Sequence, residues 1–180
     1  MYENLKQQLN PHFLFNSLTS LSSLITTEPK IARQFVYQMS KIYRYILKSS
    51  ENEIVPLINE ISFATTYVKL QQTRFSEGFV VSINVSEEFN HRKIVPVTIQ
   101  NMIENAIKHN IIDAESPLII DITVEEDYLV VKNNLQKKSV VESSNKHGLV
   151  QIKSLYKYLI DKPIVISETA EHFIIKIPLI

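Results

Sequence analysis

Asn10-Pro11-His12-Phe13-Leu14-Phe15-Asn16 opens a predicted helix with two different faces. The apolar face has leucine or isoleucine at helical spacing, at Leu14, Leu18, Leu21 and Ile25. The polar face consists of Gln8, His12, Asn16, Thr19 and Ser23. This pattern turns His12 toward solvent or a partner domain, where a neutral imidazole is a competent nucleophile and proton carrier. A surface histidine without a chemical role is the plainer explanation, and this helix by itself favours it.

Composition limits the functions that the chain can serve. Its 180 residues suffice for one ordinary domain or two small ones, and 44% hydrophobic content permits a buried core. A net charge of zero argues against nucleic-acid binding by bulk electrostatics. The chain has no cysteine, which excludes disulfides and thiol catalysis. Gly78 and Gly148 are its two glycines, too few for the usual glycine-rich phosphate loop. No apolar run reaches the length of about 18 residues that a membrane span needs.

The periodicity predicts an α+β fold whose first half is helical. Helices are expected over residues 1–26, 30–49 and 57–75, with a break at Glu28-Pro29. Pro11 either starts a new helix or kinks a longer one. The first two helices should form an antiparallel hairpin that cannot bury its apolar stripes alone. We therefore expect a second copy to complete a four-helix bundle.

The apolar period changes from 3.6 to 2 after Gly78, where we place the candidate domain boundary. The second half should form one sheet with helices on one face. The expected strands cover residues 79–85, 118–124, 128–131, 164–168 and 172–177, and the expected helices cover 96–110 and 148–160. Residues 135–147 lack a clear period and are predicted to form a mobile loop.

The helix over residues 96–110 carries a second polar cluster, made up of Asn101, Glu104, Asn105, Lys108 and His109. An amide oxygen suits Mg²⁺, and a neighbouring carboxylate can orient a water or take a proton. The two basic side chains can neutralise phosphate oxygens. An ordinary amphipathic helix with a solvated face is the alternative, and this helix by itself favours it.

Taken together, these motifs resemble the LytS/YehU-type sensor histidine kinases, which combine an internal histidine kinase segment with a GHKL-type ATPase domain. The segment from Gln8 to Asn16 is similar to the phosphoacceptor motif of that family. Val95-Pro96 and the segment from Ile103 to His109 are similar to its N-box. Arg44-Tyr45 and Leu47 resemble the second helix of the family. Its connecting helix is similar to the segment that contains Glu60, Tyr67, Gln71 and Arg74-Phe75. Two independent motifs in the family's order outweigh the plainer explanations given above.

The resemblance implies an ATP-dependent protein-histidine kinase, the homodimeric core of a two-component system. Residues 1–76 would form the helical dimerisation and histidine phosphotransfer region. Residues 77–180 would form a GHKL- or Bergerat-type α/β sandwich that binds ATP with Mg²⁺. His12 would take the γ-phosphoryl group and pass it to an aspartate in the receiver domain of a response regulator. The core would be the cytoplasmic part of a bacterial sensor, anchored in the inner membrane by an upstream region outside this chain.

The resemblance also implies roles for individual residues. Asn105 would ligate Mg²⁺, and Glu104 would assist deprotonation of His12 or orient its ring. Asn16 would hydrogen-bond the imidazole or the incoming phosphate. The nucleotide site would be lined by Asn101, Asn105, Lys108, His109, Asn133, Asn134, Gly148 and Leu149.

Two glycine-containing motifs of the family are incomplete in this sequence. Val131-Lys132-Asn133-Asn134-Leu135 stands where GHKL domains usually have an aspartate followed by glycines. Lys146-His147-Gly148-Leu149 keeps one glycine of a later pair. Glycines at such places let backbone N–H groups approach phosphates. The alternative function is therefore a catalytically weak or inactive dimeric signalling scaffold of the same fold. A kinase or ATPase without the histidine step is disfavoured by the phosphoacceptor-like segment.

Overall fold

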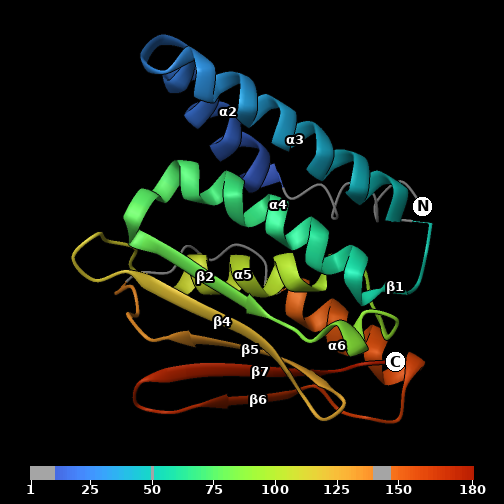
Figure 1. Cartoon of the computed structure of the whole chain (residues 1–180). Helices are drawn as coiled ribbons and strands as arrows, with labels where there is room; N and C mark the ends of the chain where they lie inside the picture. Colours follow the sequence, from blue (N-terminus) through green and yellow to red (C-terminus); the bar gives the residue numbers. More distant parts are fainter. Residues whose placement is uncertain (1–10, 50, 140–146) are drawn as a thin grey trace.

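The computed structural model describes residues 11–49, 51–139 and 147–180, and three helices come first in it. Helices α2 (Pro11–Thr27) and α3 (Pro29–Ser49) form an antiparallel hairpin, and α4 (Leu57–Phe75) lies between this hairpin and the sheet (Figure 1). The predicted break at Glu28-Pro29 is confirmed, since Pro29 begins α3. The part of the first helix that was expected before Pro11 lies outside the described residues. No helix in the described ranges has the length and apolar character needed to cross a membrane.

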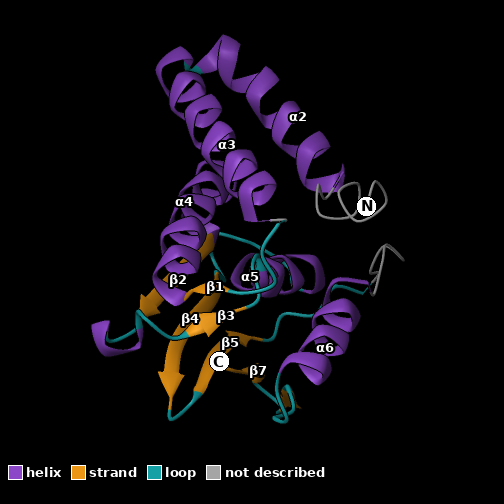
Figure 2. Cartoon of the chain, turned by 90° about the vertical axis from the view of Figure 1, so that its right-hand side faces the viewer, coloured by secondary structure: helices purple, strands orange, loops and turns teal. Residues whose placement is uncertain are grey.

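A mixed five-stranded sheet follows, with the strand order β2-β4-β5-β7-β6. Its strands are β2 (Phe79–Asn84), β4 (Leu118–Glu125), β5 (Tyr128–Asn134), β6 (Val165–Glu168) and β7 (His172–Pro178). The pair β2 and β4 is parallel, and the other pairs are antiparallel. Helices α5 (Thr98–His109) and α6 (His147–Leu159) lie on one side of the sheet (Figure 2). The predicted α+β fold, helices first and then a sheet with helices on one face, is confirmed.

Several short elements lie between the longer helices and strands, and the periodicity of the sequence did not predict them. Strand β1 (Val55–Pro56) pairs in antiparallel fashion with β3 (Lys93–Ile94). Short 3-10 helices cover Ser76–Gly78 and Glu87–Phe89. A strand of two residues is too short to show alternation. The β1–β3 pair depends on residues that are distant in the sequence.

One hydrophobic core extends from the hairpin to the sheet. Phe35 and Ile42 of α3, Tyr67 of α4 and Ile103 of α5 are all buried in it. Helix α4 packs against α3 on one side and against α5 and β2 on the other. The core therefore continues across the position of the predicted boundary between residues 76 and 77.

The predicted apolar face of α2 is buried only in part. Leu14 and Leu21 pack partly against the core, whereas Leu18 and Ile25 are 47% and 59% exposed. Phe13 takes the buried position instead and is 5% exposed. The reason is that α3 packs against one side of α2, and Tyr67 of α4 meets this side at Phe13, so the remaining apolar side chains of α2 face outward.

Asp127, in the turn between β4 and β5, contributes to the free energy of unfolding in a way that depends on pH. Hydrogen bonds from Lys162 (2.9 Å) and Arg92 (2.7 Å) lower the pKa of this carboxyl group to about 2. Because the folded-state pKa lies below the unfolded one, the stabilisation is present above about pH 4 and is lost as the pH falls toward 2.

We expect Asp127→Asn to lower the free energy of unfolding above about pH 4, and we expect its difference from wild type to shrink in more acidic solution. Urea denaturation at a series of pH values measures this difference. Asp121→Asn, at an exposed position of β4, is the matched control. An effect of Asp127→Asn that is independent of pH would show that these ion pairs do not stabilise the fold.

Candidate functional site

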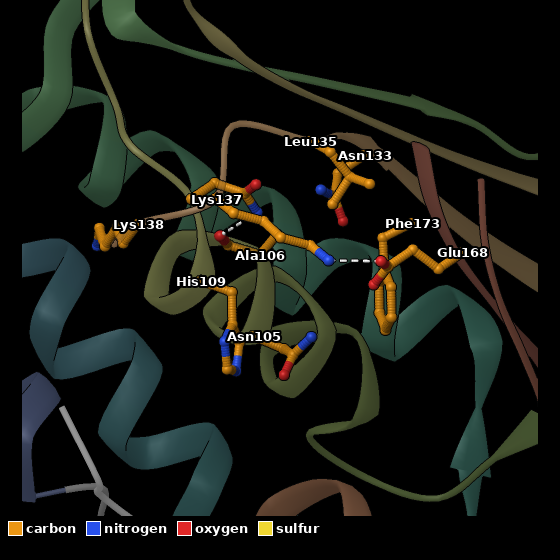
Figure 3. Close-up of a pocket in the computed structure, with 10 residues that line it drawn as sticks. Asn105, Ala106, His109, Asn133, Leu135, Lys137, Lys138, Glu168 and Phe173 are labelled. Atoms are coloured by element: carbon orange, nitrogen blue, oxygen red, sulfur yellow. Dashed lines mark hydrogen bonds and ion pairs between the residues drawn. The ribbon is translucent and has the colours of Figure 1, made fainter. Parts of the chain in front are cut away.

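A cavity of about 370 Å³ lies between α5, the end of β5 and the β6–β7 hairpin (Figure 3). This volume is within the range of about 300–1,000 Å³ that is usual for small-molecule sites. The cavity is lined by Asn105, Ala106, His109, Asn110, Asn133, Leu135, Lys137, Lys138, Glu168 and Phe173. Three residues that were predicted to bind a nucleotide therefore share one cavity, although Asn133 comes from the sheet and the others from α5.

Other predicted residues lie outside the cavity wall. The Asn134 side chain donates to the carbonyl of Pro117 (3.0 Å) and accepts from the N–H of Ile119 (2.8 Å), so it supports the start of β4. Asn101 and Lys108 belong to α5 but do not line the cavity.

Three further predictions concern side chains that the structure does not describe. Gly148 and Leu149 belong to the first turn of α6, and His12 belongs to the first turn of α2. The structure describes the backbone at these three positions, and the predicted contacts of the residues there stay predictions. Asn16 follows His12 by one turn of α2 and is half-buried.

The segment after β5 closes one side of the cavity by binding the end of α5. The N–H of Lys138 donates to the carbonyl of His109 (3.1 Å), and its ammonium donates to the carbonyl of Ile107 (3.0 Å). Lys137 forms an ion pair with Glu168 across the cavity (Figure 3). Sequence reasoning missed both lysines and Glu168, because they come from separate segments that only the folded sheet brings to the same cavity. The described part of the predicted loop, residues 135–139, is therefore bound to α5.

The surroundings of His109 keep its imidazole neutral at physiological pH. Burial lowers the pKa of His109, and the positive charges of Lys108 and Lys138 lower it further. A neutral imidazole can accept a hydrogen bond as well as donate one. Positive charge at this site is therefore carried by lysine side chains and not by His109.

Glu104 is bound to α4 and to its own helix through one carboxylate oxygen. The hydroxyl of Tyr67 donates to Oε1 (3.1 Å), and Nε2 of Gln100 donates to the same atom (2.9 Å). Burial raises the pKa of the Tyr67 phenol well above its usual value, and the charge of Glu104 adds to this, so Tyr67 stays protonated. Gln71 in turn donates to the Tyr67 oxygen (2.6 Å). This network holds the Glu104 carboxylate in one orientation beside Asn105.

Glu60 of α4 fixes the other end of α5. Its carboxylate accepts the N–H groups of Val97 (2.8 Å) and Ile99 (3.3 Å), and the hydroxyl of Tyr45 donates to it (2.7 Å). A carboxylate at a helix N-terminus also offsets the helix dipole. The helix begins at Thr98, two residues later than predicted, after Val97 with a φ of 64°. Glu60 caps this end because the residue at the N-cap position has no polar side chain.

The burial of Glu60 has an electrostatic consequence. Its side chain is fully buried, and this burial raises the pKa of Glu60, while the hydrogen bonds from Tyr45 and the backbone oppose the shift. The resemblance included Tyr45 in the family's second helix and Glu60 in its connecting helix, but nothing in the sequence indicated that they meet at α5. Together they join α3 and α4 to the helix that carries Glu104 and Asn105.

We expect Tyr45→Phe to lower the free energy of unfolding by about 1–2 kcal/mol, because it removes a donor to a buried carboxyl group. The stacking of the ring on Phe63 (4.2 Å between centroids) is retained in this variant. Tyr158→Phe is the control, since Tyr158 of α6 lies away from the hairpin and is 84% exposed; its effect should stay within about 0.5 kcal/mol. Chemical denaturation of both variants makes the comparison, and equal losses would contradict a stabilising role of the Tyr45 hydroxyl.

Comparison with known proteins identifies the family. Residues 1–79 match the family model described as "Histidine kinase". Sensor protein LytS of Staphylococcus haemolyticus is 33% identical over 125 residues, which are 69% of this chain and 21% of that protein. Sensor protein kinase HptS of Staphylococcus aureus is 38% identical over 122 residues, which are 68% of this chain and 23% of that protein. The chain thus spans about a fifth of the length of the curated relatives it matches.

Solved structures of histidine kinases overlay on the chain only loosely. The cytoplasmic segment of histidine kinase QseC gives a TM-score of 0.49 at 13% identity, over 71% of this chain and 76% of that one. A histidine kinase from Burkholderia phymatum gives 0.47 at 10% identity, over 98% of each chain. At such scores, the family follows from the sequence relatives and from the two motifs. On these grounds, the chain belongs to the LytS-type histidine kinases.

Proposed function

We propose that this chain is the kinase core of a two-component sensor. It phosphorylates its own His12 from ATP and passes the phosphoryl group to an aspartate in a response-regulator receiver domain. One observation carries the proposal: Phe13, which follows His12, packs on Tyr67, and Tyr67 donates a hydrogen bond to Glu104. Residues 1–76 serve dimerisation and histidine phosphotransfer in this proposal, and residues 77–180 bind the nucleotide.

The transfer itself needs a nucleophile, a leaving group and charge neutralisation. The unprotonated ring nitrogen of His12 attacks the γ-phosphorus, and a P–N bond forms while the P–O bond to ADP breaks. ADP keeps the electron pair of that bond. Glu104 orients the imidazole or accepts the proton from its other nitrogen, and Asn16 hydrogen-bonds the ring or the incoming phosphate. The phosphoryl group then passes to the carboxylate of the receiver domain.

The residues of the cavity fit ATP with Mg²⁺. Asn105 offers a hard amide oxygen, and Mg²⁺ usually completes its shell with phosphate oxygens and water. Within the described ranges, His, Cys, Asp and Glu form no group of three that could hold a metal ion by themselves. When bound, the metal ion neutralises charge on the phosphate oxygens. Lys138 adds positive charge at the wall, and Asn133 can offer both a donor and an acceptor to a base.

The proposal keeps the other predicted nucleotide residues, although Asn101, Lys108 and Asn134 do not line the cavity. Asn101 and Lys108 belong to the same helix as Asn105, and Asn134 supports the neighbouring strand. Gly148 and Leu149 belong to the first turn of α6, and in the proposal they lie near the phosphates.

We also propose that two chains pair through the hairpin. Large apolar side chains on α2 and α3 are exposed in the single chain: Phe15, Leu18, Ile25, Val36, Tyr37 and Leu47. A four-helix bundle of two hairpins would cover such side chains. Because the relatives are several times longer than this chain, the proposed core acts as the cytoplasmic part of a larger bacterial sensor.

A dimeric signalling scaffold without kinase activity is the second candidate. The ion pair between Lys137 and Glu168 crosses the cavity, and the segment from Val131 to Leu135 has neither the aspartate nor the glycines that the resemblance leads us to expect there. Both features would weaken the binding of ATP.

Calorimetric titration of the purified protein with ATP, in the presence and absence of Mg²⁺, separates the two candidates. The kinase predicts saturable binding that requires Mg²⁺. Absence of binding at millimolar ATP would contradict the kinase and favour the scaffold.

A further inference from the structure

We infer that the nucleotide domain of a chain phosphorylates His12 of that same chain, and not His12 of its partner. This inference rests on the proposed function. In a homodimer, each chain holds both an acceptor histidine and a nucleotide domain. His12 could therefore receive its phosphoryl group from the ATP bound to its own chain or from the ATP bound to the partner chain. The contacts that link α2 to α4 and α4 to α5 favour transfer within one chain.

The first contact anchors the start of α2 on its own chain. Phe13 directly follows His12 in the first turn of α2, and its side chain is almost fully buried. Its ring lies 5.3 Å from the ring of Tyr67 in α4 and 6.1 Å from that of Tyr43 in α3, between centroids. Tilted aromatic pairs at such distances are stabilising. The backbone of His12 is therefore held one residue away from a buried aromatic cluster.

The second contact joins this cluster to the nucleotide side. The hydroxyl of Tyr67 donates to Glu104 (3.1 Å), and Glu104 is adjacent to Asn105 of the cavity wall. Burial, followed by the charge of Glu104, raises the pKa of Tyr43 to about 12, which indicates that the carboxylate is near this second ring as well. Two side chains, those of Phe13 and Tyr67, thus connect the phosphoacceptor turn to Glu104 within one chain.

A third set of contacts holds the hairpin and the nucleotide side together. Glu60 binds Tyr45 of α3 and the first turn of α5 at once. The connector between α3 and α4 is also fixed, because Val55 of β1 pairs with Ile94 of β3, shortly before α5. These contacts hold the nucleotide side against the hairpin of its own chain, which carries His12.

Two mixed dimers with opposite expected results test the inference, using chains with different affinity tags and labelled ATP with Mg²⁺. The first pairs a wild-type chain with a chain that carries both His12→Gln and Asn105→Ala. Transfer within a chain predicts label on the wild-type chain. The second pairs a His12→Gln chain with an Asn105→Ala chain, and we expect no label above that of the two variant homodimers. Transfer between chains predicts the reverse of both results and would overturn the inference.

A measurement that needs no activity distinguishes failure of this inference from failure of the proposed function. Dimers are mixed from isotope-labelled and unlabelled wild-type chains, and the nuclear Overhauser contact between the rings of Phe13 and Tyr67 is recorded. We expect this contact within labelled chains and not in the experiment that selects contacts between chains. A contact between chains would overturn the inference even if the kinase is inactive. If the wild-type homodimer takes no label, the proposed function fails.

Discussion

Asn105→Ala is expected to abolish Mg²⁺-dependent labelling of the chain and to weaken the binding of ATP with Mg²⁺ by at least about 10- to 100-fold. Losses of this size occur even when a group that only supports a metal ligand is removed, and Asn105 is proposed to be a ligand itself. Its side chain lies in the wall of the cavity, and no cluster of carboxylates or imidazoles in the described ranges could replace it.

Calorimetry with and without Mg²⁺ measures the effect of Asn105→Ala on binding. Asn59→Ala is the matched control, because Asn59 is an exposed amide on a helix and lies away from this cavity. The control should bind ATP as the wild type does. Binding by Asn105→Ala that equals binding by Asn59→Ala would show that the amide of Asn105 does not hold the metal ion.

Glu60→Ala is expected to lower the free energy of unfolding by about 3 kcal/mol or more. The substitution leaves the partly buried hydroxyl of Tyr45 and the N–H groups of Val97 and Ile99 without their acceptor. Glu60→Gln should cost less, since its amide oxygen can still accept one or two of these bonds. Labelling should fall in Glu60→Ala as well, because the first turn of α5 loses its anchor.

Chemical denaturation of both Glu60 variants tests this expectation. Glu53→Ala is the control, because Glu53 is exposed in the connector before β1, and its effect should stay within about 0.5 kcal/mol. If Glu60→Ala and Glu53→Ala destabilise the protein equally, Glu60 does not fix the start of α5.

Periodicity predicted the regular elements well where one face of an element is buried. The predicted helix over residues 57–75 has the bounds observed for α4, and the hairpin turns at Glu28-Pro29 as expected. The predicted strand over residues 128–131 is longer in the structure, because β5 continues to Asn134. The polar end of β5 pairs with β7, and such pairing depends on a distant strand that local alternation does not show.

Helical spacing predicted the candidate site only where its residues share one helix, and Asn133 of β5 was predicted by the resemblance alone. Asn105 and His109 were recognised because they repeat at helical spacing on α5 and match a known motif. Lys137, Lys138 and Glu168 were missed, since only the folded sheet brings them to the same cavity. The links from Phe13 to Tyr67 and from Glu60 to α5 join residues more than 35 positions apart. No local pattern reports contacts of that kind.

Phosphorylation of His12 by ATP is tested by incubating the purified chain with labelled ATP and Mg²⁺ and recording which variants take up the label. We expect an acid-labile label on wild type and on His91→Gln, a control at an exposed histidine, and no label on His12→Gln. Equal labelling of His12→Gln and wild type, or no labelling of the wild type, would contradict it.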